Sequence, residues 1–343
     1  MVFMNFESLK QLLLETAQSA DADKCLELMK TYNTLSSEMF EVSNKNGDTI
    51  VHLAAKSGST AIIRLCFLHY GLDILIQRNK DGKMPLHVAA HSGQLQCVEY
   101  LLSRNVPVDA LKRSDWTPLM LACTKGDLNI VKALIKYEAN LTYRNKDGWT
   151  AFHIAAREGC VDVVKYLLKI DKMLWRTQSK NSRTPLHTAA LHGNIEVVRL
   201  LLSDTDQPID PVDCCGISPL MDAISSCHNE VFQILVDKGA SVNKTDRLGR
   251  NLLHLAAEAG NVEVCTYLIN VCHLNINSKS IHGLTALHFA VKEKSILCIQ
   301  KLLEFEADKT IQDCKGRTAL DYTTDEAICA LLNSSYGDVL LKK

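Results

Sequence analysis

The sequence predicts an all-α solenoid in which helix-turn-helix repeats are stacked and joined by β-turn fingers. A nine-residue motif returns nine times along the 343-residue chain, with spacings of 33 to 35 residues between copies. Every copy also carries the same signals for two short helices and a turn. Because a fixed period of this length is typical of stacked units that share one core, we expect about nine to ten repeats.

The motif reads roughly Thr-Pro-Leu-His-x-Ala-Ala after a glycine or a polar turn. Its central position is histidine in six copies and methionine or aspartate in the other three. An imidazole offers two hydrogen-bonding nitrogens, so we interpret it as a bridge between the helix starts of adjacent repeats. A metal ligand or an acid–base group is the alternative. The nine positions are His52, His87, Met120, His153, His187, Met221, His254, His288 and Asp321.

Each copy is expected to fold in the same order. The threonine caps the first helix, and proline fits the first turn of that helix. A glycine such as Gly93 or Gly126 then ends the helix. A second helix follows with apolar residues at i, i+3 and i+4, as in Val197, Val198 and Leu201. A loop such as NKDG returns the chain in a hairpin-like finger.

The two ends of the chain depart from the repeat, which is expected where a stack must shield its core from water. Residues 5–33 read as two amphipathic helices that lack the repeated motif. We therefore assign residues 1–36 to N-terminal capping helices, residues 37–322 to the repeats, and residues 323–343 to a C-terminal capping helix and tail.

The motif, its period and its turns resemble the ankyrin repeat, and the resemblance covers residues from about 37 to 335. It implies an ankyrin-repeat solenoid that binds another protein. The phosphate-binding, dinucleotide-binding, hydrolase-elbow and metalloprotease signatures are all absent from the sequence. We therefore expect a binding protein that is not an enzyme and that uses neither a cofactor nor a metal ion.

Composition narrows the kind of partner. The formal net charge of −1 gives no reason to expect direct binding of nucleic acid or of an anionic membrane. No apolar run is long enough to span a bilayer, and the start, with Glu7 in a helical apolar pattern, is unlike a signal peptide. We expect a cytoplasmic protein, with the nucleus as a second location, that is monomeric on its own.

Thirteen cysteines lie along the chain without the spacing of a zinc site, which fits a reducing compartment. Many fall at apolar helix positions, as Cys97 and Cys265 do, where a free thiol behaves as a small hydrophobe. Cys214 and Cys215 are the only adjacent pair. We interpret this pair as exposed loop residues, and a redox role is the alternative.

Charge at the turns is the first feature that the repeat does not explain. The residue two places before the turn glycine, or its equivalent, is basic in five consecutive copies. Helices of neighbouring repeats pack about 10 Å apart, so these side chains are expected to form a row. The row is either a set of solvated loop residues or a surface that attracts an acidic protein. Its members are Lys45, Lys80, Arg113, Lys146 and Lys180.

The three tryptophans are the second such feature, because all of them fall within sixty residues. Trp116 and Trp149 occupy the same position in consecutive copies, and Trp175 follows them. Tryptophan is enriched at interface hot spots, although core filling between fingers is the alternative. Because Arg113 and Lys146 lie close to these tryptophans in sequence, we place the partner-binding site on the third and fourth repeats.

A closer resemblance inside the ankyrin family is carried by SDWTPLMLACTKGDLNIVKALI, RNKDGWTAFHIAAREG and SKNSRTPLHTAALHGNIEVVRLLL. It implies a partner, the catalytic domain of alanyl-tRNA synthetase, and an activity in which lysine side chains accept serine that the synthetase has wrongly activated. The resemblance puts the acceptors at Arg113, Lys146 and Arg176. Since arginine stays protonated and cannot act as the nucleophile, Lys146 is implied as the acceptor. Lys112, Lys80 and Lys180 are the alternatives that could substitute for the missing lysines.

The expected partner-binding surface joins the basic row to the tryptophans. An adaptor that binds another acidic protein through the same fingers is the alternative to the synthetase partner. The residues expected at this surface are Lys45, Lys80, Arg113, Trp116, Lys146, Trp149, Trp175, Arg176 and Lys180.

Overall fold

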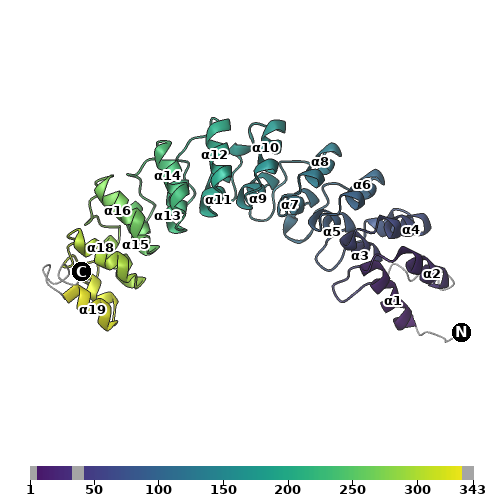
Figure 1. Cartoon of the computed structure of the whole chain (residues 1–343), viewed down its shortest axis with the longest axis horizontal. Coiled ribbons are helices and arrows are strands. Elements are labelled where there is room, and N and C mark those ends of the chain that lie inside the picture. Colours follow the sequence, from purple (N-terminus) through teal and green to yellow (C-terminus); the bar gives the residue numbers. More distant parts are fainter. Residues whose placement is uncertain (1–5, 33–41, 334–343) are drawn as a thin grey trace. The chain divides into compact units, whose positions relative to one another are not determined.

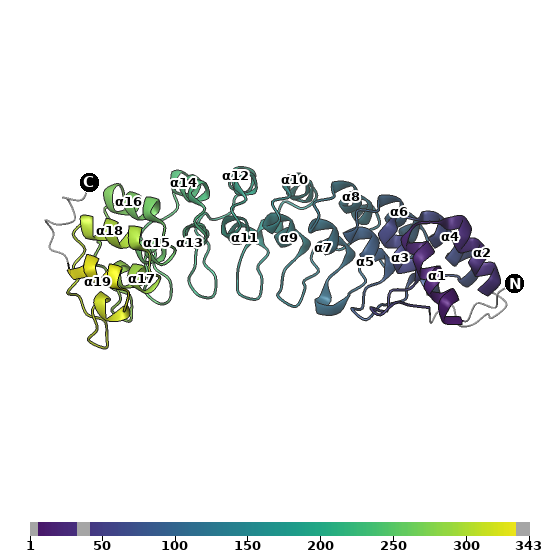
Figure 2. The same ribbon diagram turned by 60° about the horizontal axis from the view of Figure 1, so that its bottom comes forward.

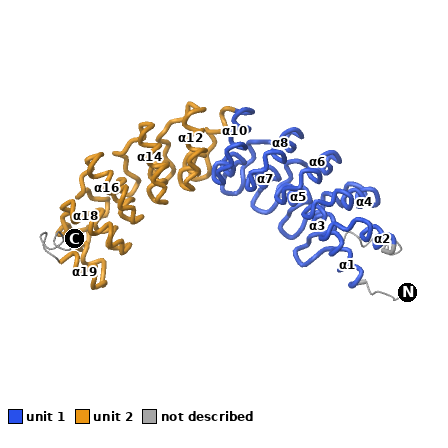
Figure 3. The backbone as a smooth tube through the Cα atoms, in the orientation of Figure 1, with its two compact units in different colours: residues 1–171 blue, residues 172–343 orange. Residues whose placement is uncertain are grey.

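The computed structural model describes residues 6–32 and 42–333, and it confirms the predicted all-α architecture of helix pairs joined by turn fingers. These residues form nineteen α-helices, four 3-10 helices and two isolated β-bridges. None of the helices in this part of the chain is long and apolar enough to cross a bilayer. The chain divides into two compact units, residues 1–171 and 172–343 (Figure 3). Of the segments assigned from the sequence, residues 1–5, 33–41 and 334–343 lie outside the described residues.

The first unit consists of five helix pairs in chain order. Its helices are α1 (Phe6–Gln18), α2 (Ala22–Tyr32), α3 (Ile50–Ser57), α4 (Thr60–Tyr70), α5 (Pro85–His91), α6 (Leu95–Ser103), α7 (Pro118–Cys123), α8 (Leu128–Lys136), α9 (Ala151–Arg157) and α10 (Val161–Ile170), with 3-10 helices η3 (Asp73–Leu75) and η4 (Arg113–Asp115) between pairs. From α3 on, the odd-numbered helices contact one another along one side and the even-numbered helices along the other (Figure 1). The expected N-terminal helices α1 and α2 pack on α3 and α4 in the same way.

The second unit continues the pattern. Its elements are η5 (Leu174–Arg176), α11 (Pro185–Leu191), α12 (Ile195–Asp204), α13 (Pro219–Ser225), α14 (Asn229–Asp237), α15 (Leu252–Glu258), α16 (Val262–Asn270), α17 (Ala286–Lys292), α18 (Ile296–Glu304), η6 (Ala319–Tyr322) and α19 (Glu326–Asn333). In the last copy the 3-10 helix η6 takes the place of the first helix of the pair. Helix α19 packs on α18 and buries Ile328 and Leu332.

In the six copies that have it, the repeated histidine is buried at the third residue of the first helix of the pair. In α3, Nδ1 of His52 accepts a hydrogen bond from the Thr49 N–H at 3.2 Å, and Nε2 donates to the Lys83 carbonyl of the next repeat at 2.8 Å. In α11, Nε2 of His187 donates in the same way to the Ile217 carbonyl at 3.0 Å. The histidine therefore bridges adjacent repeats, which confirms the structural interpretation of these residues.

Consecutive fingers are tied to one another at their tips by single backbone hydrogen bonds. In the first unit the Lys80 N–H donates to the Asn46 carbonyl at 3.0 Å, and the Lys146 N–H donates to the Ser114 carbonyl at 3.0 Å. The second unit repeats this bond between its own fingertips. Figure 2 shows the fingers extending from the same side of their helix pairs within each unit. The fingertips are therefore held in register and are not independent loops.

A short polar side chain closes the turn at the tip of most fingers. In the second finger, Oδ1 of Asn79 accepts hydrogen bonds from the N–H groups of Asp81 at 3.0 Å and Lys83 at 2.9 Å. The equivalent side chain accepts from the N–H four residues later in eight of the nine fingers. These eight residues are Asn44, Asn79, Asn145, Ser179, Asp213, Asp246, Ser280 and Asp313. The third finger has Lys112 at this position.

Candidate partner-binding groove

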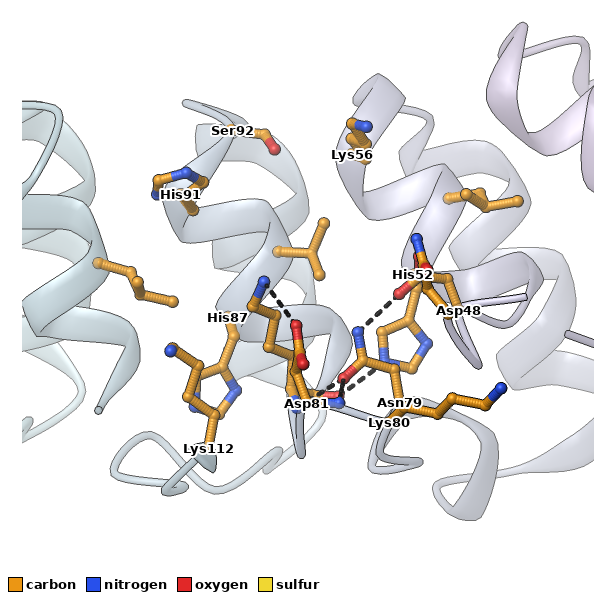
Figure 4. A pocket seen from close by; sticks show the side chains of 15 residues that line it. Asp48, His52, Lys56, Asn79, Lys80, Asp81, His87, His91, Ser92 and Lys112 are labelled. Carbon is orange, nitrogen blue, oxygen red and sulfur yellow. Dashed lines mark hydrogen bonds and ion pairs between the residues drawn. The ribbon is translucent and has the colours of Figure 1, made fainter. Parts of the chain in front are cut away.

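A groove of about 600 Å³ opens in the first unit between the fingers and the first helices of neighbouring repeats. Its walls come from α3 and α5, from the first three fingers, and from Leu121 of α7. Figure 4 shows it from close by, with Lys112 and Asp48 toward opposite ends of the view. Two of the residues expected from the sequence, Lys80 and Lys112, line this groove.

The groove carries an excess of positive charge. Its carboxylates are engaged by groove residues, since Asp48 accepts from Asn79 Nδ2 at 2.7 Å and Asp81 pairs with Lys83 at 3.5 Å. Among the described residues no ion pair of Lys112 is found. The charged lining residues are Lys56, Lys80, Lys83, Lys112, Asp48 and Asp81, so four cations face two anions. A surface of this sign favours an acidic partner.

Lys112 lies at this groove because it breaks the pattern of the fingers. An ammonium group cannot accept a hydrogen bond, so it cannot replace the polar side chain that closes the other fingers. The third finger keeps only the backbone hydrogen bond that the other fingers also form, which runs here from the Lys112 N–H to the Trp116 carbonyl at 3.0 Å. Its turn places both Ser114 and Asp115 in the left-handed region, with φ of 67° and 60°. The Lys112 side chain is thereby available to line the groove.

The surroundings of Lys112 lower its pKa. Burial lowers the pKa of Lys112 below its ordinary value of 10.5, the positive charge of Lys83 lowers it further, and Asp81 opposes the shift. The ammonium nitrogen lies 5.4 Å from the centre of the Trp116 ring. Because the neutral amine is the nucleophile, a lowered pKa makes a lysine more reactive at neutral pH. Lys146, the other acceptor candidate, is exposed at a fingertip.

Three histidines of the groove do not add to its charge. Burial lowers the pKa of His52, His87 and His91, and that of His87 falls to about 4. In His52 and His87 both ring nitrogens are also hydrogen-bonded, Nδ1 to the N–H that precedes its own helix and Nε2 to a carbonyl of the next repeat. The lysines are therefore the groups that give the groove its net positive charge at neutral pH.

The fingertip row has a structural role in addition to its charge. Four of its five members, Lys45, Lys80, Arg113 and Lys146, are exposed on the first unit, and Lys180 lies in the second. The Lys80 ammonium donates to the Lys45 carbonyl at 2.7 Å, and Nη2 of Arg113 donates to the Lys80 carbonyl at 3.1 Å. These two side chains lie back along the preceding fingertip, so only part of the charge projects toward solvent.

Trp116 and Trp149 are half-buried, and each carries a cation on its ring. Lys112 lies over Trp116, and the Arg157 guanidinium lies 5.6 Å from the centre of the Trp149 ring. Trp149 also stacks on His153 with a centroid distance of 6.4 Å. Both rings thus take part in packing inside the first unit and keep some exposed surface near the fingers.

Trp175 belongs to the second unit, in η5, and not to a finger. Arg176 lies over its ring at 5.0 Å from the centroid. Together with Pro208 and Pro211 these residues line a depression of about 300 Å³. The structure therefore assigns Trp175 and Arg176 to a different unit from Trp116 and Trp149.

Sequence reasoning missed Lys56, Lys83 and His91, because nothing in their local pattern sets them apart from other polar helix and finger residues. A signal for Lys112 was present: eight of the nine copies have Asn, Asp or Ser at its position. Within residues 6–32 and 42–333, no group of three or more His, Cys, Asp or Glu side chains is placed to hold a metal ion.

Comparisons with known proteins point to one family. The model for ankyrin repeats in three copies matches residues 5–112, 106–177, 170–246 and 253–342. Inversin from Canis lupus familiaris is 35% identical over 116 residues, which are 33% of this chain and 11% of inversin. The E3 ubiquitin-protein ligase KEG from Arabidopsis thaliana is 27% identical over 321 residues, 89% of this chain and 19% of the ligase. Human rabankyrin-5 is 30% identical over 129 residues, 37% of this chain and 11% of rabankyrin-5. The chain thus matches less than a fifth of the length of each of these relatives.

Proposed function

The chain belongs to the ankyrin-repeat family, and on that premise we propose that it binds the catalytic domain of alanyl-tRNA synthetase and accepts misactivated serine on lysine side chains. Ankyrin-repeat proteins are in general non-catalytic scaffolds that bind other proteins. The choice of partner rests on the resemblance of three repeat stretches to ankyrin repeat domain-containing protein 16. The single structural observation that supports it is Lys112, a lysine of lowered pKa in a basic groove.

Serine capture would correct an error that the synthetase makes when it activates amino acids. A pocket built for alanine cannot strongly reject an analogue that only adds a hydroxyl group, so serine is activated in error. Seryl-adenylate is a mixed anhydride with a reactive carbonyl carbon. A neutral lysine amine attacks this carbon, the bond to the phosphate oxygen breaks, and AMP leaves. After loss of one proton from nitrogen, the product is a stable amide of serine on the lysine, and the chain acts once per lysine without turnover.

Lys112 is the acceptor that the surroundings support best. It combines partial burial, the nearby charge of Lys83 and an aromatic neighbour, Trp116, in one groove. Lys146 keeps the position that the resemblance assigns to an acceptor, and we propose it as the second site. Arg113 and Arg176 stand at the other two such positions, where they contribute charge to partner binding and cannot take serine.

Serine capture is tested by mass spectrometry after the full chain is incubated with the synthetase catalytic domain, ATP and serine. We expect a seryl adduct on Lys112 that depends on both serine and ATP. Lys112→Arg is expected to abolish the adduct at position 112 and to leave only capture at the second site, Lys146, because arginine cannot act as the nucleophile. Lys45→Arg, an exposed fingertip lysine of the same unit, is the matched control and is expected to leave capture unchanged.

Two outcomes would count against this proposal. Equal adduct formation on all exposed lysines would show that Lys112 has no privileged reactivity. Lysines without a seryl adduct, together with intact binding, would leave the second candidate function, an adaptor that binds an acidic protein in the groove. The excess of two positive charges in the groove favours such a partner. In either case we propose a cytoplasmic protein, with the nucleus as a second compartment.

A further inference from the structure

The tip of the sixth finger carries two neighbouring thiols. Cys214 and Cys215 are both exposed, and their sulfur atoms lie 3.9 Å apart. All thirteen cysteines of the chain are free, and six of them are fully buried in the helices. This pair is different because both thiols are open to solvent and both point into the same region.

The repeat does not require thiols at these two positions. The corresponding pairs in the other eight fingers mix lysine, arginine, isoleucine, cysteine and polar residues: Lys45–Asn46, Lys80–Asp81, Arg113–Ser114, Lys146–Asp147, Lys180–Asn181, Arg247–Leu248, Ile281–His282 and Cys314–Lys315. Only the ninth finger has a thiol here, the exposed Cys314, and its neighbour is a lysine. The chain thus contains one dithiol tip and one single-thiol tip on the same scaffold.

The dithiol tip is held in place from both sides. The Cys214 N–H donates to the Asn181 carbonyl at 3.0 Å, and the Cys215 carbonyl accepts from the Arg247 N–H at 2.9 Å. Inside the finger, Oδ1 of Asp213 accepts from the Cys215 N–H at 2.7 Å. Because the backbone is fixed, the two thiols are presented together before any ligand arrives, which reduces the entropy lost on binding.

An ordinary disulfide does not fit this arrangement. Adjacent Cα atoms are about 3.8 Å apart, whereas disulfides usually need about 4.4 to 6.8 Å between Cα atoms. A disulfide between Cys214 and Cys215 would therefore strain the turn and would be easily reduced. A single soft atom that bonds to both sulfurs requires less distortion of the backbone than a disulfide does, because only the side chains have to rotate.

We propose that Cys214 and Cys215 form a chelating site for a trivalent thiophilic metalloid, with organic arsenicals of the type R–As(OH)₂ as the ligand class. Two S–H bonds and two As–O bonds break, two As–S bonds form, and two molecules of water leave. Arsenic stays trivalent, so the step needs neither an oxidant nor a reductant. Soft thiolate sulfur is the ligand type that selects such soft centres.

The test uses phenylarsine oxide, which hydrates to this form, and the freshly reduced full chain under native conditions. Intact-mass measurement in excess 2-mercaptoethanol is expected to show one phenylarsenic adduct on the wild type, which 2,3-dimercaptopropanol removes. Cys214→Ser and Cys215→Ser are each expected to weaken binding on the order of 100-fold, because the second sulfur attacks within the same molecule. Cys314→Ser is the matched control and is expected to keep the adduct.

Buried thiols are the competing source of an adduct. Cys265 and Cys298 lie in neighbouring helices, α16 and α18, and both are fully buried. Cys298→Ser is therefore expected to keep the adduct as well. An adduct that survives in the Cys214→Ser/Cys215→Ser double variant, or a wild-type adduct as weak as that of either single variant, overturns the proposal. Far-ultraviolet circular dichroism confirms that each variant keeps its helices.

Discussion

Acidification from about pH 7.5 to about pH 4.5 is expected to shift the urea midpoint of the full chain to a clearly lower concentration. Burial lowers the pKa of His87 and His187 from 6.5 to about 4, and it lowers the pKa of three further bridging histidines. As the pH falls, these histidines become protonated in the unfolded chain before they do so in the folded chain. Their contribution to the free energy of unfolding is therefore fully present above pH 6.5 and is lost as the pH falls toward 4. His87 and His187 each contribute about 3 kcal/mol to this loss of unfolding free energy.

One group opposes this trend. Burial raises the pKa of Asp222 to about 7 against the pull of the Arg183 guanidinium, so this carboxyl favours the folded state as the pH falls. Five histidines outweigh one carboxyl, and the net direction remains a loss of stability in acid. Repeat arrays need not unfold in one step, so the midpoint of each transition is the quantity to compare.

The chain provides a control for the histidine effect. Met120 and Met221 hold the bridging position in the third and sixth copies, so His87→Met follows a substitution that the repeat already tolerates. This variant is expected to be less stable at neutral pH, because the bridge is lost, and to show a smaller decrease between the two pH values. A midpoint that does not depend on pH in the wild type would contradict this explanation.

Removal of the Arg183 side chain is expected to be the most destabilising single change in the second unit, at about 3–5 kcal/mol. Nη1 of Arg183 lies 3.1 Å from Asp213 Oδ2, and Nη2 lies 2.7 Å from Asp222 Oδ2. Both carboxylates are buried. Arg183→Leu leaves two buried carboxylates without their shared cation. Urea denaturation followed by circular dichroism measures the effect.

A second substitution, Asp222→Leu, is expected to restore stability to the Arg183→Leu variant. Leucine occupies the position of Asp222 in several other copies, as Leu121 and Leu255 do. Arg183→Leu combined with Asp222→Leu is therefore expected to recover most of the lost stability, because a buried ion pair can be replaced by apolar packing. If the double variant is as unstable as the single variant, the loss comes from the size of the arginine side chain and not from the unpaired charge.

The architecture could be predicted because its determinants are local and repeated nine times. The capping residue, the glycine turn and the apolar spacing of the second helix are each visible within one copy, and agreement among copies fixes the register. The histidine bridge could be predicted for the same reason, since His52 and His187 occupy one repeated position and form the same bonds.

The groove could not be predicted in the same way. Lys56 on α3, Lys83 on the second finger and Lys112 on the third come together only through the packing of three copies. The lowered pKa of Lys112 likewise depends on burial and on the charge of Lys83, 29 residues away, and no local sequence pattern predicts either. The ion pairs of Arg183 with Asp213 and Asp222 span 30 and 39 residues and were missed for the same reason.

We propose that the first unit binds the synthetase through its basic groove and through Trp116 and Trp149. Calorimetric titration of the full chain with the synthetase catalytic domain tests it most directly. Lys83→Glu/Lys112→Glu changes the charge within the groove, and Lys132→Glu/Lys136→Glu makes the same change in net charge on exposed positions of α8. Trp116→Ala/Trp149→Ala removes the two rings.

We expect the wild type and the α8 variant to bind with similar affinity, and the groove and tryptophan variants to lose at least about 100-fold, since hot-spot side chains contribute about 2 kcal/mol or more each. Absence of binding by the wild type, or equal weakening by the groove and α8 variants, would contradict the claim.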